Sequence, residues 1–196
     1  MQLQTLRYER ADTPAGQVAT ITFDEQGSPV NTMCLQWQHD MAAVTQQVVN
    51  DRDAIKGLIL ASAKTTFFAG ADLKGVMRMT AADAPRVYAE IERIKACFRT
   101  LETLGIPVVS CINGSALGGG MEVALIGHHR IAVDDAKLQL GLPELTLGLI
   151  PGATGITKFT RLLGLMGAQP HIMESKLFGP REALEIGVVH DLVEGA

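Results

Sequence analysis

Two carboxylates stand almost alone in apolar stretches of this 196-residue sequence. Glu122 lies in INGSALGGGMEVAL, shortly after three consecutive glycines, and Glu144 lies in LGLPELTLGLIPG. Acidic side chains are rarely buried without a partner or a task. If both carboxyl groups face one water molecule, they resist double ionisation, and one keeps its proton near neutral pH. One can then act as a base while the other donates a proton, which suits the addition of water to an activated double bond.

The glycines Gly118–Gly120 come at the expected start of a helix, where free N–H groups carry partial positive charge. Glycines let a ligand approach that backbone closely, so this turn could hold an anion or a carbonyl oxygen that becomes one. The segment GSALGGG matches neither of the common phosphate-binding glycine motifs. The alternative interpretation is that the glycines only allow close helix–strand packing, and this segment alone does not decide between the two.

A second loop favours the first interpretation. The segment FFAGADL, residues 67–73, also follows an apolar strand and also carries a glycine between small residues. An oxyanion hole usually needs two N–H donors, and two such loops after neighbouring strands would supply them. For Glu144, helix capping or an ion pair with Arg161 remains the alternative to a catalytic role.

The elements that must position these residues follow from hydrophobic periodicity. We expect Asn31 and Thr32 to cap the first helix. Gly105 and Pro107 end the long helix that precedes the central strand. Strands alternating with helices imply parallel pairing with right-handed crossovers in a single α/β domain, residues 1–196. The predicted strands are 18–24, 58–63, 108–112, 130–133, 137–140 and 188–193, and the predicted helices are 35–48, 81–104, 118–128, 154–163 and 181–186.

Composition excludes several classes of function. Hydrophobic residues make up 47% and charged residues 19% of the chain, and the net charge is −4 without a basic run, so no nucleic-acid surface is expected. The polar N-terminus predicts no signal peptide, and the glycines and Pro107 argue against a membrane span around Glu122. Three scattered cysteines indicate a reducing compartment, such as the bacterial cytoplasm. The histidines show no metal-ligand spacing, so we expect no metal site.

These three segments, FFAGADL, INGSALGGGMEVAL and GLPELTLGLIPG, resemble the enoyl-CoA hydratase/isomerase family, the crotonase superfamily, in the same order and over essentially the whole chain. The stretch GSPVNTM, residues 27–33, looks most like the N-terminal hydratase region of multifunctional fatty-acid oxidation alpha subunits. The resemblance implies repeated ββα turns stacked as a short superhelix. It also implies that the chain stops after the core, without the C-terminal helices of the family, and we expect it to be a piece of a longer protein.

The resemblance also implies roles for individual residues. The N–H groups of Ala71 and Gly119 would bind the thioester carbonyl oxygen, Glu122 and Glu144 would hold the catalytic water, and Gly152 would help to seat it. The coenzyme A path would be lined by further residues of the first loop. These are Ala69, Ala71, Asp72, Leu73 and Lys74, together with Gly119.

The implied reaction is hydration of a 2-trans-enoyl-CoA to a 3-hydroxyacyl-CoA in fatty-acid β-oxidation. A Δ3-Δ2-enoyl-CoA isomerase, or a non-catalytic acyl-CoA-binding or assembly module, stays open as an alternative. The resemblance implies no cofactor for this chain, because coenzyme A belongs to the substrate and NAD would bind only a following dehydrogenase domain. It implies a homo-oligomer or a place in a larger multifunctional complex, and the chain alone is expected to be inactive if the missing helices complete the site.

Overall fold

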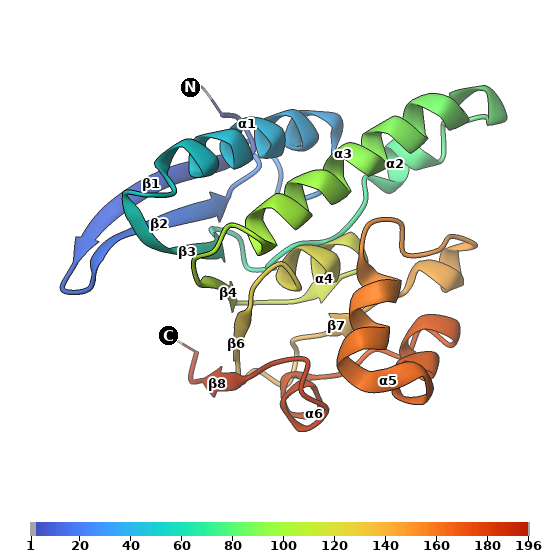
Figure 1. The fold of residues 1–196 in the computed structure, drawn as a ribbon. Helices are drawn as coiled ribbons and strands as arrows, with labels where there is room; N and C mark the ends of the chain where they lie inside the picture. The colour runs from blue at the N-terminus through green and yellow to red at the C-terminus, as the bar shows by residue number, and fades with distance from the viewer. Residues whose placement is uncertain (1–2, 196) are drawn as a thin grey trace.

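The computed structural model describes residues 3–195, so the ends of the predicted 1–196 domain, residues 1–2 and 196, lie outside the described residues. Its centre is a six-stranded sheet in the order β1-β2-β3-β4-β6-β8 (Figure 1). The first pair is antiparallel and every other pair is parallel. The strands are β1 (Leu6–Thr13), β2 (Gly16–Phe23), β3 (Ile55–Ser62), β4 (Val108–Ile112), β6 (His129–Val133) and β8 (Asp191–Val193).

Helices connect the parallel strands, and α1 and α3 lie side by side (Figure 1). A separate two-stranded sheet, β5 (Ala116–Leu117) with β7 (Leu140–Gly141), carries the segments that lead into the candidate site. The helices are α1 (Leu35–Asp51), α2 (Leu73–Val76), α3 (Ala84–Glu102), α4 (Gly119–Ala124), α5 (Gly155–Met173) and α6 (Pro180–Glu185), with short 3₁₀ helices η1 (Ala81–Asp83) and η2 (Glu144–Leu147).

The core explains why one loop of the candidate site is held firmly. Phe68 lies in the core with its ring edge-to-face against Phe23, at 5.4 Å between centroids, and against Trp37, at 5.3 Å. Phe67 is equally buried beside it. These two aromatic side chains anchor the start of the FFAGADL loop, because aromatic rings bury a large apolar surface and prefer this edge-to-face geometry.

The parallel pairing of β3 with β4 brings the two candidate loops together. Leu58 pairs with Val108 and Leu60 with Ser110, so both strands end at the same edge of the sheet. The FFAGADL loop follows β3, and the glycine segment follows β4. Neighbouring parallel strands with right-handed crossovers place the segments after their carboxyl ends side by side.

The structure corrects four expectations. The strand β1 was not predicted, because as an edge strand it exposes most of its length and its charged sequence shows no apolar alternation. The N-cap of α1 is Cys34, whose sulfur accepts the N–H of Trp37, so the prediction of Asn31 and Thr32 as caps is wrong. The predicted strand 137–140 pairs only at Leu140–Gly141.

The fourth correction concerns the last long helix, which runs to Met173 rather than to residue 163. Gly164 interrupts it with φ 72° and ψ 168°, so the predicted end coincides with a break inside the element. Elsewhere the expected elements agree with the structure to within a few residues. No helix in residues 3–195 is long and apolar enough to cross a membrane.

Candidate active site

The three glycines of the GGG turn have different structural tasks. Gly118, between β5 and α4, has φ 55°, a conformation that side chains disfavour. A Cβ on Gly120 would lie 2.0 Å from the carbonyl oxygen of Phe68, so this glycine permits close packing of the helix on the neighbouring loop. A Cβ on Gly118 would lie 2.7 Å from Glu144 Oε1, so this glycine admits a carboxyl group. Close packing therefore accounts for Gly118 and Gly120, and Gly119 is the glycine predicted to donate its N–H to a ligand.

The FFAGADL loop lies directly against this turn. Phe68 forms a parallel bridge with Ala116, and the N–H of Leu117 donates to the Phe68 carbonyl at 3.2 Å. Gly70 has φ 100° and lies close to the backbone of the glycine segment. A Cβ added to Gly70 would lie 2.7 Å from the Leu117 carbonyl oxygen and 3.5 Å from the Gly119 nitrogen. The residue after Gly70 is Ala71, and so the two predicted donors belong to loops in contact.

Both predicted donors are unused. Among residues 3–195, neither the N–H of Ala71 nor that of Gly119 donates a hydrogen bond to the protein. Gly119 is the first residue of α4, so its N–H has no partner within the helix. Ala71 is exposed, and Gly119 is buried. Two free N–H groups on adjoining loops are what a carbonyl oxygen that gains negative charge requires.

The residues predicted to line the coenzyme A path form an accessible strip. Ala69, Leu73 and Lys74 are exposed, and Asp72 is half-buried just before the short helix α2. The N–H of Ala69 is already used, since it donates to the carbonyl of Asn31 at 2.9 Å. This strip leads directly into the free N–H of Ala71.

Glu122 lies on α4 and is 2% exposed. Its Oε1 accepts three backbone N–H bonds, from Ala153 at 3.0 Å, Thr154 at 2.8 Å and Gly155 at 2.7 Å. These groups form the N-terminus of α5, where the helix dipole favours a negative charge. Burial raises the pKa of Glu122, and the three N–H donors oppose that rise. Because Oε1 already accepts three hydrogen bonds, a proton on this carboxyl group resides on Oε2.

Glu144 has the opposite surroundings. It begins η2, and its Oε2 is buried without a hydrogen-bond partner among residues 3–195. Burial raises its pKa to about 7, and the nearby charge of Glu122 adds to the rise. No ion pair to Arg161 forms within the described part of the chain, and Arg161 is exposed. The side chain caps no helix either, so both structural alternatives for Glu144 are wrong.

The sequence reasoning missed the groups that support Glu122. Gly152 was expected to seat the water. It is exposed, an added Cβ would lie 3.8 Å from Ile91 Cδ1, and the N–H groups bound to Glu122 come from the next three residues. The start of a helix after IPG was the signal that could have found them. Lys158, one turn further along α5, pairs with Glu102 and with the carbonyl of Leu125, and its charge lowers the pKa of Glu122.

The described residues contain no group of three or more His, Cys, Asp or Glu side chains that could hold a metal ion. The three cysteines Cys34, Cys97 and Cys111 are free thiols. Burial raises the pKa of each thiol, which makes these side chains poor nucleophiles. The chemistry available at this site is therefore that of two carboxyl groups and two backbone N–H donors.

Sequence comparison finds relatives among the alpha subunits of fatty acid oxidation complexes. A fatty acid oxidation complex subunit alpha from Shewanella oneidensis is 38% identical over 178 residues, which are 90% of this chain and 25% of that protein. The homologous subunit of Shewanella amazonensis is 37% identical over 177 residues, also 25% of its length. The chain thus spans about a quarter of these relatives.

Solved structures agree in fold. An enoyl-CoA hydratase from Bacillus anthracis, 30% identical, superposes with a TM-score of 0.84 over 97% of this chain and 70% of its own. The protein AtuE of Pseudomonas aeruginosa, also 30% identical, gives 0.84 over 98% and 71%. The fold is the crotonase fold expected from the sequence. Residues 13–195 match the family model described as enoyl-CoA hydratase/isomerase, and this chain belongs to that family.

Proposed function

We propose that this chain catalyses the hydration of 2-trans-enoyl-CoA thioesters to 3-hydroxyacyl-CoA. One observation carries the proposal: two carboxyl groups with opposite hydrogen bonding lie beside two unused N–H donors. Enzymes that move two protons use pairs of titratable groups whose environments push their pKa values apart.

In the proposed mechanism the thioester carbonyl oxygen accepts the N–H groups of Ala71 and Gly119. The coenzyme A moiety passes along the exposed strip of Ala69 and Asp72–Lys74. Negative charge builds on the carbonyl oxygen when a nucleophile attacks C3, and the two donors stabilise it. Removing one such donor costs about 3–4 kcal/mol in the barrier of acyl-transfer enzymes.

The proton transfers follow from the surroundings of each carboxyl group. Glu122 is held through Oε1, so its Oε2 takes a proton from a water molecule, and the resulting hydroxyl bonds to C3. Glu144, whose pKa is about 7, is half-protonated near neutral pH and delivers its proton to C2. The atoms of one water molecule are thereby added, and Glu122 returns the proton to Glu144 through solvent. Gly152 would seat this water. The reaction needs no cofactor.

The relatives are named as subunits of fatty acid oxidation complexes, which supports a role for this reaction in fatty-acid oxidation. We propose that the chain is the hydratase part of a multifunctional protein that acts in β-oxidation within a larger complex in the bacterial cytoplasm. NAD would then serve a 3-hydroxyacyl-CoA dehydrogenase domain elsewhere in that protein and not this chain.

A second activity, Δ3-Δ2-enoyl-CoA isomerisation, is favoured by the unpartnered carboxyl group of Glu144. A group with a pKa of about 7 can both take and return a proton at neutral pH. Isomerisation needs only one such group, to move a proton between C4 and C2.

Ultraviolet absorbance of the conjugated enoyl thioester tests both activities. The 196-residue chain should reduce this absorbance with crotonyl-CoA by hydration, and should create it from 3-trans-hexenoyl-CoA if it also isomerises. Turnover of 3-hexenoyl-CoA alone would make the isomerase the main activity. Binding of butyryl-CoA without turnover of either substrate would replace the enzyme by a thioester-binding module.

A further inference from the structure

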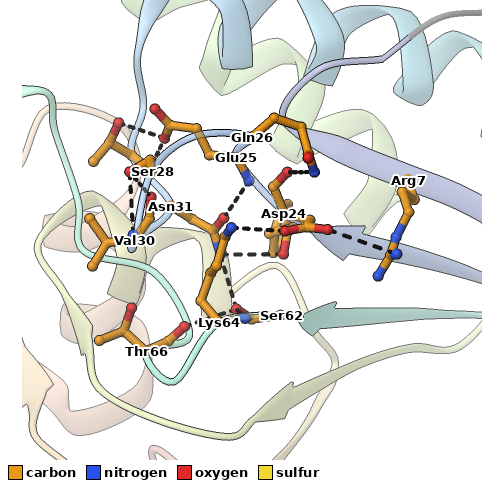
Figure 2. Close-up of polar contacts among 12 residues, drawn as sticks. Arg7, Asp24, Glu25, Gln26, Ser28, Val30, Asn31, Ser62, Lys64 and Thr66 are labelled. Atoms are coloured by element: carbon orange, nitrogen blue, oxygen red, sulfur yellow. Dashed lines mark hydrogen bonds and ion pairs between the residues drawn. The ribbon is translucent and has the colours of Figure 1, made fainter.

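Asn31 is a buried polar residue without a place in the mechanism so far. It is 1% exposed and lies between β2 and α1. Its Oδ1 accepts the N–H of Glu25 at 3.0 Å, and its Nδ2 donates to Ser62 Oγ at 2.9 Å (Figure 2). Nδ2 also donates to the carbonyl of Phe67 at 3.2 Å. A third carbonyl, that of Phe23, lies 3.4 Å from Nδ2. The side chain therefore joins the ends of β2 and β3 to the FFAGADL loop.

The backbone beside Asn31 continues this attachment toward the predicted oxyanion hole. The carbonyl of Asn31 accepts the N–H of Ala69 at 2.9 Å, and the N–H of Met33 donates to the carbonyl of Gly70, also at 2.9 Å. The second of these bonds ends at the carbonyl of the peptide group whose N–H belongs to Ala71. Because a peptide group is planar, fixing its carbonyl also fixes the direction of its N–H.

The same segment also touches the second donor. The Sδ of Met33 would lie 2.7 Å from a Cβ added to Gly119, so the methionine packs on the glycine that carries the other free N–H. On its opposite side, the loop is bonded to the glycine segment through Phe67 and Ser115, at 3.0 Å between the N–H and the carbonyl oxygen. The segment Asn31–Met33 thus contacts both halves of the hole.

We propose that Asn31 is a positioning residue that holds the Ala71 N–H of the oxyanion hole in line with that of Gly119. This inference rests on the proposed function. Asn31 does not touch the substrate. It acts through the Phe67–Gly70 backbone: its amide donates to the carbonyl of Phe67, and its own carbonyl accepts the N–H of Ala69. The buried amide is saturated with hydrogen bonds, so its loss leaves the Phe67 carbonyl and the N–H of Glu25 without these partners and lets the loop shift.

The test compares Asn31→Ala and Asn31→Ser with the unsubstituted chain. A displacement of about 1 Å in a catalytic group can lower the rate about 100-fold, so we expect kcat for crotonyl-CoA to fall by about 10- to 100-fold. We expect KM to change by no more than about threefold, because the coenzyme A strip is not altered. The kcat of Asn31→Ser, which keeps one hydrogen-bonding group, should lie between those of Asn31→Ala and the unsubstituted chain.

Isotope-edited infrared spectroscopy measures the polarisation of the bound carbonyl group, which a general loss of protein stability does not change. Butyryl-CoA labelled with ¹³C at the carbonyl should show a lowered C=O stretching frequency when it binds, and this shift should shrink in folded Asn31→Ala. The matched control is Asn113→Ala. Asn113 also donates its amide to carbonyls, those of Ser62 and Lys64, but it is exposed and both carbonyls lie before the Phe67–Gly70 stretch.

The outcomes separate the inference from the function on which it rests. Wild-type kcat and an unchanged carbonyl shift in folded Asn31→Ala would overturn the positioning role alone. An equal loss in Asn113→Ala would also overturn it, since any damage to the loop would then suffice. If the unsubstituted chain itself binds butyryl-CoA without a carbonyl shift, the oxyanion hole is absent, and both proposals fall. Should Asn31→Ala not fold, Asn31→Ser decides by the same criteria.

Discussion

Glu122 and Glu144 are both single carboxylates in apolar segments, yet the fold surrounds them differently. Glu122 is 2% exposed, and its Oε1 accepts three backbone N–H bonds at a helix N-terminus. Glu144 starts a short 3₁₀ helix, and its buried Oε2 has no partner among residues 3–195. Burial raises the pKa of both carboxyl groups, and the comparison shows that only at Glu122 does a helix terminus oppose that rise.

The largest expected effect comes from removing the exchangeable proton at either position. Glu122→Gln and Glu144→Gln should each lower kcat for crotonyl-CoA hydration by about 10²–10⁴, because glutamine cannot act as an acid or a base. Binding of butyryl-CoA should change little, which calorimetric titration can check. Isomerisation that survives in Glu122→Gln but not in Glu144→Gln would sharpen the division of roles. Full hydration activity in either variant would show that the assignment is wrong.

The pH dependence of the reaction should report Glu144. Its pKa of about 7 means that it is protonated below this pH, and the proposed role as proton donor requires the protonated form. We therefore expect kcat/KM to fall above about pH 7, approaching a tenfold loss per pH unit. The residual activity of Glu144→Gln should lack this limb. If kcat/KM of that variant falls above pH 7 in the same way, the titration belongs to another group.

The two carboxylates should contribute differently to stability. Glu122, which accepts three hydrogen bonds, should contribute more to the free energy of unfolding than Glu144, which has an unpartnered oxygen. Glu122→Ala leaves three N–H groups at the start of α5 without an acceptor, so it should lower the free energy of unfolding by about 1–3 kcal/mol. Glu144→Ala removes a carboxyl group with an unpartnered oxygen and should change it by about 0.5 kcal/mol or less. Urea unfolding at pH 7 measures both. Equal losses would mean that the helix terminus contributes nothing.

A smaller effect than the loss in Glu122→Ala is a pH-dependent stabilisation by Glu144→Gln. The folded-state pKa of about 7 lies above the ordinary 4.5, so folding is penalised once Glu144 must ionise inside the protein. The penalty is absent below about pH 4.5 and complete above about pH 7. Allowing for solvent that still reaches the side chain, the variant should gain about 1 kcal/mol at pH 8 and nothing at pH 4. A gain independent of pH would contradict the raised pKa.

Much of the fold and the candidate site was predictable from local patterns. Hydrophobic periodicity predicted the strand 18–24 and the helix 35–48, which the structure confirms as β2 and α1 to within a few residues. Glu122 and Glu144 were recognisable because lone acids are unusual in apolar segments, whereas Ala71 and Gly119 were named from the family resemblance. The acceptor role of Glu122 was not predictable, since its three donors are more than thirty positions away in sequence. Asn31 was misread as a helix cap, because its partners Ser62 and Phe67 are equally distant.

The sequence by itself determined the family, the order of strands and helices, and the residue types available for chemistry, because these depend on local periodicity and on short motifs. Only the tertiary structure decided how the two carboxylates differ, which N–H groups stay free, and what Asn31 holds. These properties depend on long-range packing. Parallel pairing of β3 with β4 brings the two loops into contact, and the placement of α5 directs its N-terminus at Glu122. Hydrogen bonds between residues so far apart leave no periodic trace in the chain.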